Sequence, residues 1–419
     1  MLCSLRKAYQ LSSVKINLMF WGFELSEEQK MIVEAIREFA VKELTPERMR
    51  EYEEKESFPW DLYRKVCQQG FQTLHFPEEY GGQGYGLLEH FIYVYEITKV
   101  DPPVGDTLCG AHFGAELLLD FGTHEQKAKW LPSLAKGEIT IASMFTEPAG
   151  GSDLTRVLDT KALKVDHETW KINGTKTFVT NGETFRVANV LAQTDLNARP
   201  PYKGQTIFLL ERKEGIETMP LHGKMGWRSS PTSEVTFTDV TAKDNDILGG
   251  LANLGRGFYM TIAFLPTARA KIGCMGVAAA EAALERAVKY AKEREAFGRK
   301  IGSFQGLAHR LSEAALKVEL GKSLLFRAIK ILEKARVNKA YAEEATKFSS
   351  MLKYYGASLA VEVCDLAIDV FGGYGYMADY DIERWFRWSK KLELVEGTKE
   401  IQKNAIARCL LGKNLVEKF

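Results

Sequence analysis

The chain has almost no net charge and no short cysteine spacing, and each absence excludes a class of protein. Lysine plus arginine number 56 and aspartate plus glutamate number 55. Electrostatic attraction to nucleic acid or to an anionic membrane surface is therefore not expected. The six cysteines lie far apart and form no CxxC pair. This pattern is typical neither of a disulfide framework nor of a cysteine zinc site, and it favours reduced thiols.

Metal-binding, membrane-spanning and phosphate-loop patterns are missing as well. The seven histidines are dispersed, without an HxxxH arrangement on one helical face, so we predict no metal. No apolar run approaches the ~20 residues that cross a bilayer, and no membrane span is expected. Gly321-Lys322-Ser323 lies in a helical pattern and lacks the earlier glycine of a phosphate-binding loop. A globular protein with a small-molecule partner remains.

What the chain does have is length and apolar content: 419 residues, 45% of them apolar. This is enough for two or three domains. From the change in periodicity we predict an N-terminal extension (1–22), a helical domain (23–140), a middle β-domain (141–252) and a second helical domain (253–419). The expected fold class is α+β, mostly α, with a C-terminal part that resembles a four-helix bundle.

Local signals support this division. Ser26 and Gln29 form a capping box at the start of the first helix. Short β-branched and aromatic runs between 141 and 250, separated by turn pairs at Asn173-Gly174 and Asn181-Gly182, predict an antiparallel sheet. After Gly257 the helical period returns, with one apolar face formed by Ile272, Met275, Ala279, Ala283 and Ala287.

The first 22 residues leave two alternatives open. They hold Arg6, Lys7 and Lys15 and no acidic residue, as in a transit peptide, which would place the protein in the mitochondrial matrix. The other alternative is a disordered or mis-started extension with the true start near Met19. Because the arginine content of transit peptides is missing, we favour the second alternative and a cytoplasmic protein.

Two segments of the middle domain suit the binding of a polar cofactor. A glycine-rich loop, Thr146 to Asp153, carries hydroxyls at Thr146 and Ser152 and could bring backbone N–H groups close to an anion or a heterocycle edge. Phe178 and Thr180 place an aromatic ring and a hydroxyl two residues apart at a strand end. Taken singly, the first segment also fits an ordinary turn and the second a hairpin with a core phenylalanine.

Two segments of the last domain add charge and a carboxylate. Arg294, Phe297 and Gln305 offer a cation and an aromatic face, suited to a pyrophosphate and an adenine, although cations are also common at helix ends. A Gly372-Gly373 segment is followed later by Glu396-Gly397-Thr398, where Thr398 is a candidate N-cap of the last helix. Glu396 could be a reactive carboxylate or a favourable charge near a helix N-terminus.

In this order and spacing, together with segments 124–132 and 224–232, the chain resembles the acyl-CoA dehydrogenase family from about Phe23 to Leu411. The resemblance implies FAD bound mainly by the β-domain. Thr146 and Thr180 would touch the isoalloxazine edge, Phe178 would lie against the ring, and Ser152 would lie near the pyrophosphate and the acyl-CoA.

The resemblance also implies an oligomer. In the family, the residues that match Arg294, Phe297 and Gln305 reach the FAD diphosphate and adenosine of a neighbouring subunit, so a homotetramer built as a dimer of dimers is expected. By the same match Gly372, Gly373 and Thr398 belong to the cofactor site.

For the reaction, the resemblance implies that Glu396 is the base that removes the α-proton of an acyl-CoA, while FAD accepts the β-hydride. The substrate site would include Arg269 and Gly397 besides Ser152. A minority of the family places the base before the arginine that corresponds to Arg269, and this chain has Ala268 there. An electron-transfer flavoprotein is the expected electron acceptor, in the β-oxidation of fatty acids or the breakdown of branched-chain amino acids.

Departures from the family pattern, and alternatives to the main reading, remain. Asp369 replaces a common glutamine beside the diphosphate, where it would be repulsive unless Arg294 neutralises it, and Trp388 replaces a common aspartate.

Segment 101–122 lacks Arg and Lys, which disfavours a dicarboxylyl substrate and favours a mono-acyl one, without fixing the acyl group. The alternatives are an oxygen-reducing acyl-CoA oxidase, although these are usually longer, and a catalytically silent relative that acts in binding or assembly.

Overall fold

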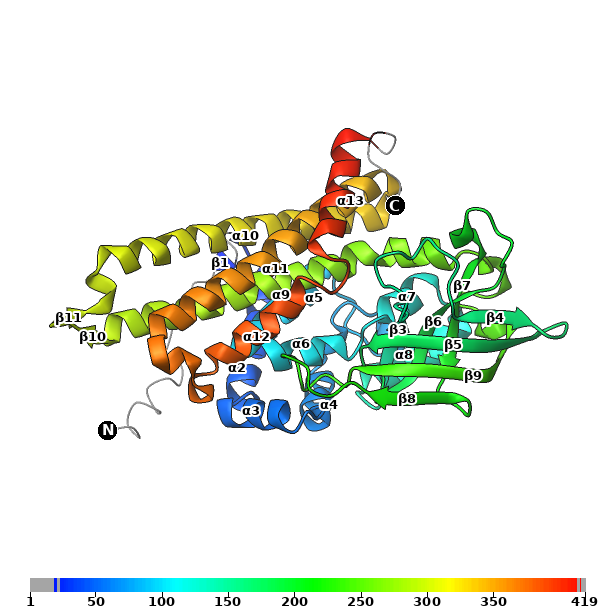
Figure 1. The fold of residues 1–419 in the computed structure, drawn as a ribbon, viewed down its shortest axis with the longest axis horizontal. Coiled ribbons are helices and arrows are strands. Elements are labelled where there is room, and N and C mark those ends of the chain that lie inside the picture. Colours follow the sequence, from blue (N-terminus) through cyan, green and yellow to red (C-terminus); the bar gives the residue numbers. More distant parts are fainter. Residues whose placement is uncertain (1–18, 21–22, 413–414, 416–419) are drawn as a thin grey trace.

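The computed structural model describes residues 19–20, 23–412 and 415. The predicted extension 1–22 therefore lies outside the described residues, apart from 19–20. Figure 1 shows an elongated molecule, with long C-terminal helices side by side and a β-sheet packed toward one end of them. The fold class, α+β and mostly α, is confirmed.

The N-terminal helices cover one side of the long helices. The capping box is confirmed: Gln29 N donates to Ser26 Oγ (3.2 Å), and Ser26 N donates to Gln29 Oε1 (3.0 Å). A buried cluster of apolar side chains joins these helices to the C-terminal ones, so the two helical parts share a core. The helices are α2 (Glu27–Glu43), α3 (Pro46–Glu54), α4 (Trp60–Gln68), α5 (Leu87–Val100), α6 (Pro102–Gly110), α7 (Ala115–Phe121) and α8 (His124–Ala135).

The middle of the chain forms a seven-stranded sheet in the order β3-β6-β4-β5-β9-β8, with β7 paired to β6. The prediction of an antiparallel sheet is wrong around β6, because both β3 and β4 run parallel to it. A strand that enters from the helical domain pairs here with a strand distant in sequence, which local patterns do not reveal. The strands are β3 (Thr140–Met144), β4 (Lys161–Lys164), β5 (Thr169–Val179), β6 (Phe185–Gln193), β7 (Gln205–Glu211), β8 (Ile216–Pro220) and β9 (Ser233–Lys243).

One predicted turn lies inside a strand. Asn173-Gly174 falls within β5, where the pairing register shifts and Gly174 has a φ of 142°. A Cβ on Gly174 would lie 2.5 Å from Thr160 Cα, so glycine here serves a bulge and a close backbone approach. Asn181-Gly182, in contrast, does form a turn, with Asn181 at a φ of 63°.

The last part is a bundle in which α9 and α11 cross very closely. Cβ atoms on Gly276 and Gly356 would lie 2.2 Å and 2.3 Å from carbonyl oxygens of the facing helix, so glycine is required for this approach. The predicted apolar face of α9 is buried, as expected. The elements are α9 (Gly257–Glu293), β10 (Glu295–Ala296), β11 (Arg299–Lys300), α10 (Gln305–Val337), α11 (Ala342–Phe371), α12 (Ile382–Leu392) and α13 (Lys399–Leu411).

Among the described residues, α9 is the one helix that is long and apolar enough to cross a membrane by length and composition. Of its most apolar window, 67% is buried inside the protein. Such burial on several sides is that of a core helix.

Candidate active site

Glu396 lies in the loop between α12 and α13, where three long side chains hold the backbone. Glu396 and Gly397 have φ values of 53° and 90°. Arg269 Nε donates to the Glu396 carbonyl (3.3 Å), and Gln402 Nε2 donates to both carbonyls (3.0 and 2.8 Å). Lys353 Nζ donates to Gly397 O (2.7 Å). Because these contacts reach the backbone, they fix the loop without using the carboxylate of Glu396.

The last helix begins directly after this loop. Thr398 is its N-cap, as predicted, and its Oγ1 accepts from Ile401 N (3.4 Å). Burial raises the pKa of Glu396 above its ordinary value, and the positive charges of Arg269 and Lys353 oppose this shift without cancelling it. A carboxylate with a raised pKa is a better proton acceptor than one in water. The loop therefore presents a positioned base.

The departure at Trp388 has a structural explanation. Its indole is buried, and Nε1 donates to Asp106 Oδ2 of α6 (2.9 Å). The same oxygen accepts from Lys391 Nζ, which also lies 3.3 Å from the ring centroid of Trp227. An aspartate at position 388 would face Asp106 and repel it. In this chain Trp388 and Asp106 form a hydrogen-bonded pair instead. Neither Asp106 nor Lys391 was predicted from the sequence.

The predicted cofactor residues of the β-domain lie together. Thr177 N donates to Thr146 O (3.0 Å), which joins the glycine-rich loop to β5. Phe178 is 70% exposed and Ser152 is exposed, so both are open to a bound molecule. Phe178 also has a φ of 53°, so the strand end departs from the regular alternation that the prediction assumed. Thr180 is half-buried at the end of the same segment.

A buried carboxylate organises the glycine-rich loop. Glu147 Oε1 accepts from Lys176 Nζ and Thr160 N (both 2.9 Å). Its Oε2 accepts from Arg156 Nη2 (2.7 Å) and Asp159 N (2.8 Å). Burial alone would raise the pKa of Glu147, but Lys176 and these donors hold it below its ordinary value. Burial lowers the pKa of Lys176 to about 8.

We expect Glu147→Gln to lower the free energy of unfolding by about 3–5 kcal/mol, because Lys176 would remain buried without its counter-charge. Urea unfolding of the purified variant measures this. The exposed pair Glu362–Lys317 is the control, since Glu362→Gln should change stability by less than ~1 kcal/mol. Equal effects of the two substitutions would contradict the importance of the buried pair.

A second group of predicted residues lines a pocket at the far end of the bundle. Arg294, Gly372 and Gly373 border a pocket of about 460 Å³, with Tyr290 and Phe371 among its other walls. The flanking β10–β11 hairpin exposes 94% of Phe297, and Gln305 is exposed at the start of α10. A cation, backbone glycines and aromatic rings suit a diphosphate joined to an adenine.

Asp369, next to this pocket, is not paired with Arg294. Its Oδ2 accepts from Arg310 Nη2 (2.6 Å). Arg294 is therefore not needed to neutralise Asp369, because Arg310 of α10 does so. Arg294 stays available to a ligand of the pocket.

The two groups of predicted cofactor residues cannot meet in one chain. Figure 1 shows the β10–β11 hairpin at the opposite end of the molecule from the sheet. At about 1.5 Å per residue, the part of α9 from Arg269 to its end at Glu293 is about 36 Å long. The structure thus forms two separate groups of predicted residues. One group contains Glu396, Gly397, Thr398 and Arg269. The other group, at the far end of α9, contains Arg294, Gly372 and Gly373.

Comparisons with known proteins identify the family of the chain. Three family models match in succession, acyl-CoA dehydrogenase N-terminal (26–138), middle (142–240) and C-terminal (255–411) domains. The short-chain-specific acyl-CoA dehydrogenase of Clostridium acetobutylicum is 34% identical over 92% of this chain and 98% of its own. CarC, a subunit of the caffeyl-CoA reductase-Etf complex of Acetobacterium woodii, is 32% identical over 93% and 99%.

Among solved structures, butyryl-CoA dehydrogenase from Megasphaera elsdenii is 30% identical and has a TM-score of 0.85. The match covers 93% of this chain and 99% of that one. The chain therefore belongs to the acyl-CoA dehydrogenase family of FAD-dependent oxidoreductases.

Proposed function

We propose that this protein oxidises a mono-acyl-CoA thioester to the trans-2-enoyl-CoA, with Glu396 as the base. The observation that carries the proposal is the half-buried Glu396, whose backbone is held by hydrogen bonds and whose pKa is raised. The carboxylate takes the α-proton, the electrons of that C–H bond form the new C=C bond, and the β-hydrogen leaves as hydride. FAD, when bound, supplies the hydride acceptor. The backbone N–H of Glu396 is the proposed donor to the thioester oxygen, where negative charge develops.

The proposed cofactor site uses two subunits. Thr146, Phe178 and Thr180 of one chain hold the flavin ring, with Ser152 near the pyrophosphate and the acyl-CoA. Arg294, Phe297, Gln305 and the two glycines of a neighbouring chain hold the diphosphate and adenosine. The separation of these sets along α9 supports the division, because one chain cannot supply both. This arrangement requires at least a dimer, and a homotetramer built as a dimer of dimers is the proposed assembly.

The proposed electron acceptor is an electron-transfer flavoprotein. Support comes from the similarity to CarC, which is named as a subunit of a complex with Etf. The mono-acyl preference is supported by the charges near Glu396. Lys271 and Lys391 lie close to segment 101–122, but Glu116 and Asp106 of that segment already neutralise them. A second, distal carboxylate would therefore find neither of these two lysines free.

The test is a panel of mono-acyl-CoA thioesters added anaerobically to the purified, flavin-loaded protein. We expect the extracted flavin to be FAD. We also expect at least one thioester to reduce, and so bleach, the bound flavin within seconds of mixing. Reoxidation by an electron-transfer flavoprotein should be much faster than by oxygen. Extraction of FMN would overturn the proposal. The absence of bleaching by any thioester would overturn it in favour of a catalytically silent relative. Fast reoxidation of the reduced flavin by oxygen would identify an oxidase.

A further inference from the structure

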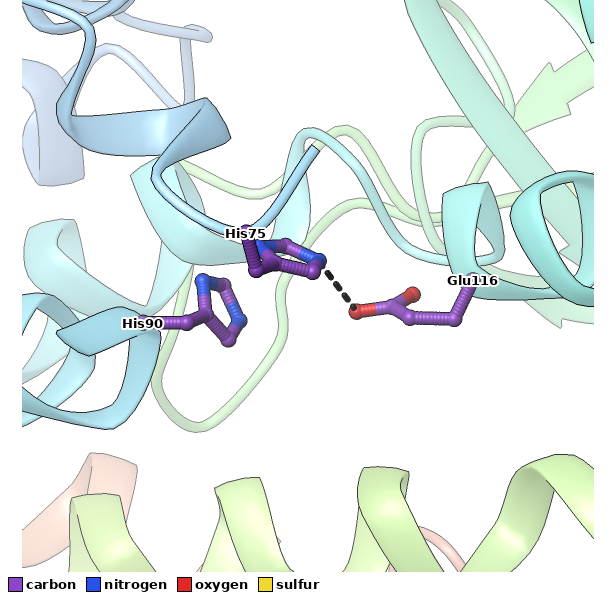
Figure 2. A group of neighbouring side chains, drawn as sticks. All are labelled: His75, His90 and Glu116. Carbon is purple, nitrogen blue, oxygen red and sulfur yellow. Dashed lines mark ion pairs between the residues drawn. The ribbon is translucent and has the colours of Figure 1, made fainter. Parts of the chain in front are cut away.

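Close to Lys271 of α9, three polar side chains from three elements are buried against one another. Figure 2 shows His75, from the segment before Glu78, pointing toward Glu116 of α7, with His90 of α5 beside it. One ligand atom of each lies within 4.8 Å of the others. The side chains of His75 and Glu116 are 3% exposed, and His90 is 4% exposed. Sequence spacing gave no sign of this group, because its members share no helix.

The group has an unusual excess of hydrogen-bonding atoms without partners. Both ring nitrogens of His75 and of His90 are buried without a hydrogen-bond partner, as are Nδ1 of His112 and Oε2 of Glu116, and His75 Nε2 lies 3.9 Å from Glu116 Oε1. Buried polar atoms in native proteins are nearly always paired with protein, water or a ligand. So many unpaired atoms in one place indicate a polar binding partner.

A metal ion is not the partner that the geometry favours. Oε1 of Glu116 already accepts from Lys271 Nζ, so a divalent ion would lie beside an ammonium group with a single carboxylate to balance both. The rings of His75 and His90 have centroids 3.9 Å apart at 46°. They lie partly face to face, whereas two imidazole ligands of one ion direct their in-plane lone pairs at one point.

The charges point to an uncharged partner that both donates and accepts. Burial lowers the pKa of His75 to about 3 and that of His90 well below its ordinary value. Both imidazoles are therefore neutral, and each offers one N–H donor and one acceptor nitrogen. Lys271 balances Glu116. A hydroxyl group has the matching pair of functions, one hydrogen to donate and lone pairs to accept.

The position along α9 connects this group to the reaction. Lys271 follows Ala268 by three residues and therefore lies on the same side of the helix. Ala268 is buried in the same apolar cluster as Ala115 and Leu117 of α7, and it directly precedes Arg269, which donates to the Glu396 carbonyl. Lys271 is also among the cations that lower the pKa of Glu396. The group thus lies beside α9, within one helical turn of the residue that holds the loop of Glu396.

We propose that His75, His90 and Glu116 bind a hydroxyl group on the acyl chain, so that the preferred substrate is a hydroxylated acyl-CoA. This inference rests on the proposed function and names its substrate class. His75 and His90 supply donors and acceptors, and the free Oε2 of Glu116 accepts the hydroxyl hydrogen. Lys271 acts as a positioning residue that holds the Glu116 carboxylate in place.

The experiment compares matched thioesters that differ only in a terminal hydroxyl. Straight chains from butyryl to decanoyl, and phenylpropionyl-CoA, are each paired with the hydroxylated counterpart and scored by anaerobic bleaching of the bound flavin. At the matching length we expect kcat/KM to favour the hydroxylated member by about a hundredfold or more, because a site built for a hydroxyl leaves its own polar groups unpaired with the plain analogue.

Two variants test the residues. In His90→Leu the preference should fall to within about threefold of unity, and in His90→Gln, which keeps a donor and an acceptor, much of it should return. Thermal melts and flavin content show that each variant is folded and loaded.

Equal kcat/KM within every pair, in a protein that oxidises plain thioesters, would overturn the inference and leave the proposed function intact. A tightly held divalent metal at one per chain, lost in His90→Leu, would overturn it in favour of a metal site. Bleaching by no thioester at all would overturn both.

Discussion

Glu396→Gln is expected to slow flavin reduction by an acyl-CoA by about a thousandfold or more, while FAD and acyl-CoA still bind. The amide has the shape of the carboxylate but cannot take the α-proton. The clamp from Arg269 and Gln402 reaches the backbone carbonyls, so it survives the substitution. Anaerobic single-turnover bleaching with the best substrate of the panel measures the rate, and a thermal melt reports stability.

The nearby Glu393 provides a matched control. Glu393 is buried, and its carboxylate is paired with Lys390 and Lys399, so Glu393→Gln should lower stability and leave the bleaching rate within about tenfold of wild type. The pH dependence gives a second check. Since burial raises the pKa of Glu396, the wild-type rate should rise with pH through a value above the usual carboxyl range, and the glutamine variant should lack this rise. A Glu396→Gln protein that bleaches at nearly the wild-type rate would exclude Glu396 as the base.

The second large effect concerns the pocket at the far end of the bundle. Arg294→Ala should purify with little FAD and little activity, because the pocket loses its cation for the diphosphate. Co-expressed with Glu396→Gln chains, however, it should regain about a quarter of the wild-type activity if chains pair at random. In a mixed pair, one site combines an intact base from one chain with an intact Arg294 from the other.

Arg299 on the same hairpin serves as the control. It lies over the ring of Phe304 and does not line the pocket, so Arg299→Ala should retain FAD. A mixture with no more activity than its two parents would show that Arg294 serves its own chain. FAD content, read from the absorbance spectrum, accompanies each activity measurement.

Features that depend on neighbouring residues could be predicted from the sequence. The capping box at Ser26, the N-cap at Thr398 and the buried face of α9 were predicted and are confirmed. Each needs only residues within a few turns of helix, where spacing alone determines which side chains meet. The family followed from the order of such segments along nearly the whole chain.

Features that depend on distant partners could not be predicted in this way. Asp369 and Arg310 are 59 residues apart, and Trp388 and Asp106 are 282 apart. The unpredicted partner of Asp369 and the missing explanation for Trp388 have this common cause. The parallel pairing of β3 with β6 and the grouping of His75 with Glu116 likewise appear only when the chain is folded. The roles of the cofactor residues came from the resemblance, and they stay predictions.

The close crossing of α9 and α11 has a consequence for how this protein can evolve. Where Gly276 faces Gly356, no side chain can be added without separating the helices. These two helices carry Arg269 and Lys353, which hold the loop of the base, so neither can shift to admit a different substrate without moving that loop. Any substitution that keeps the loop of Glu396 in place must therefore retain glycine at positions 276 and 356.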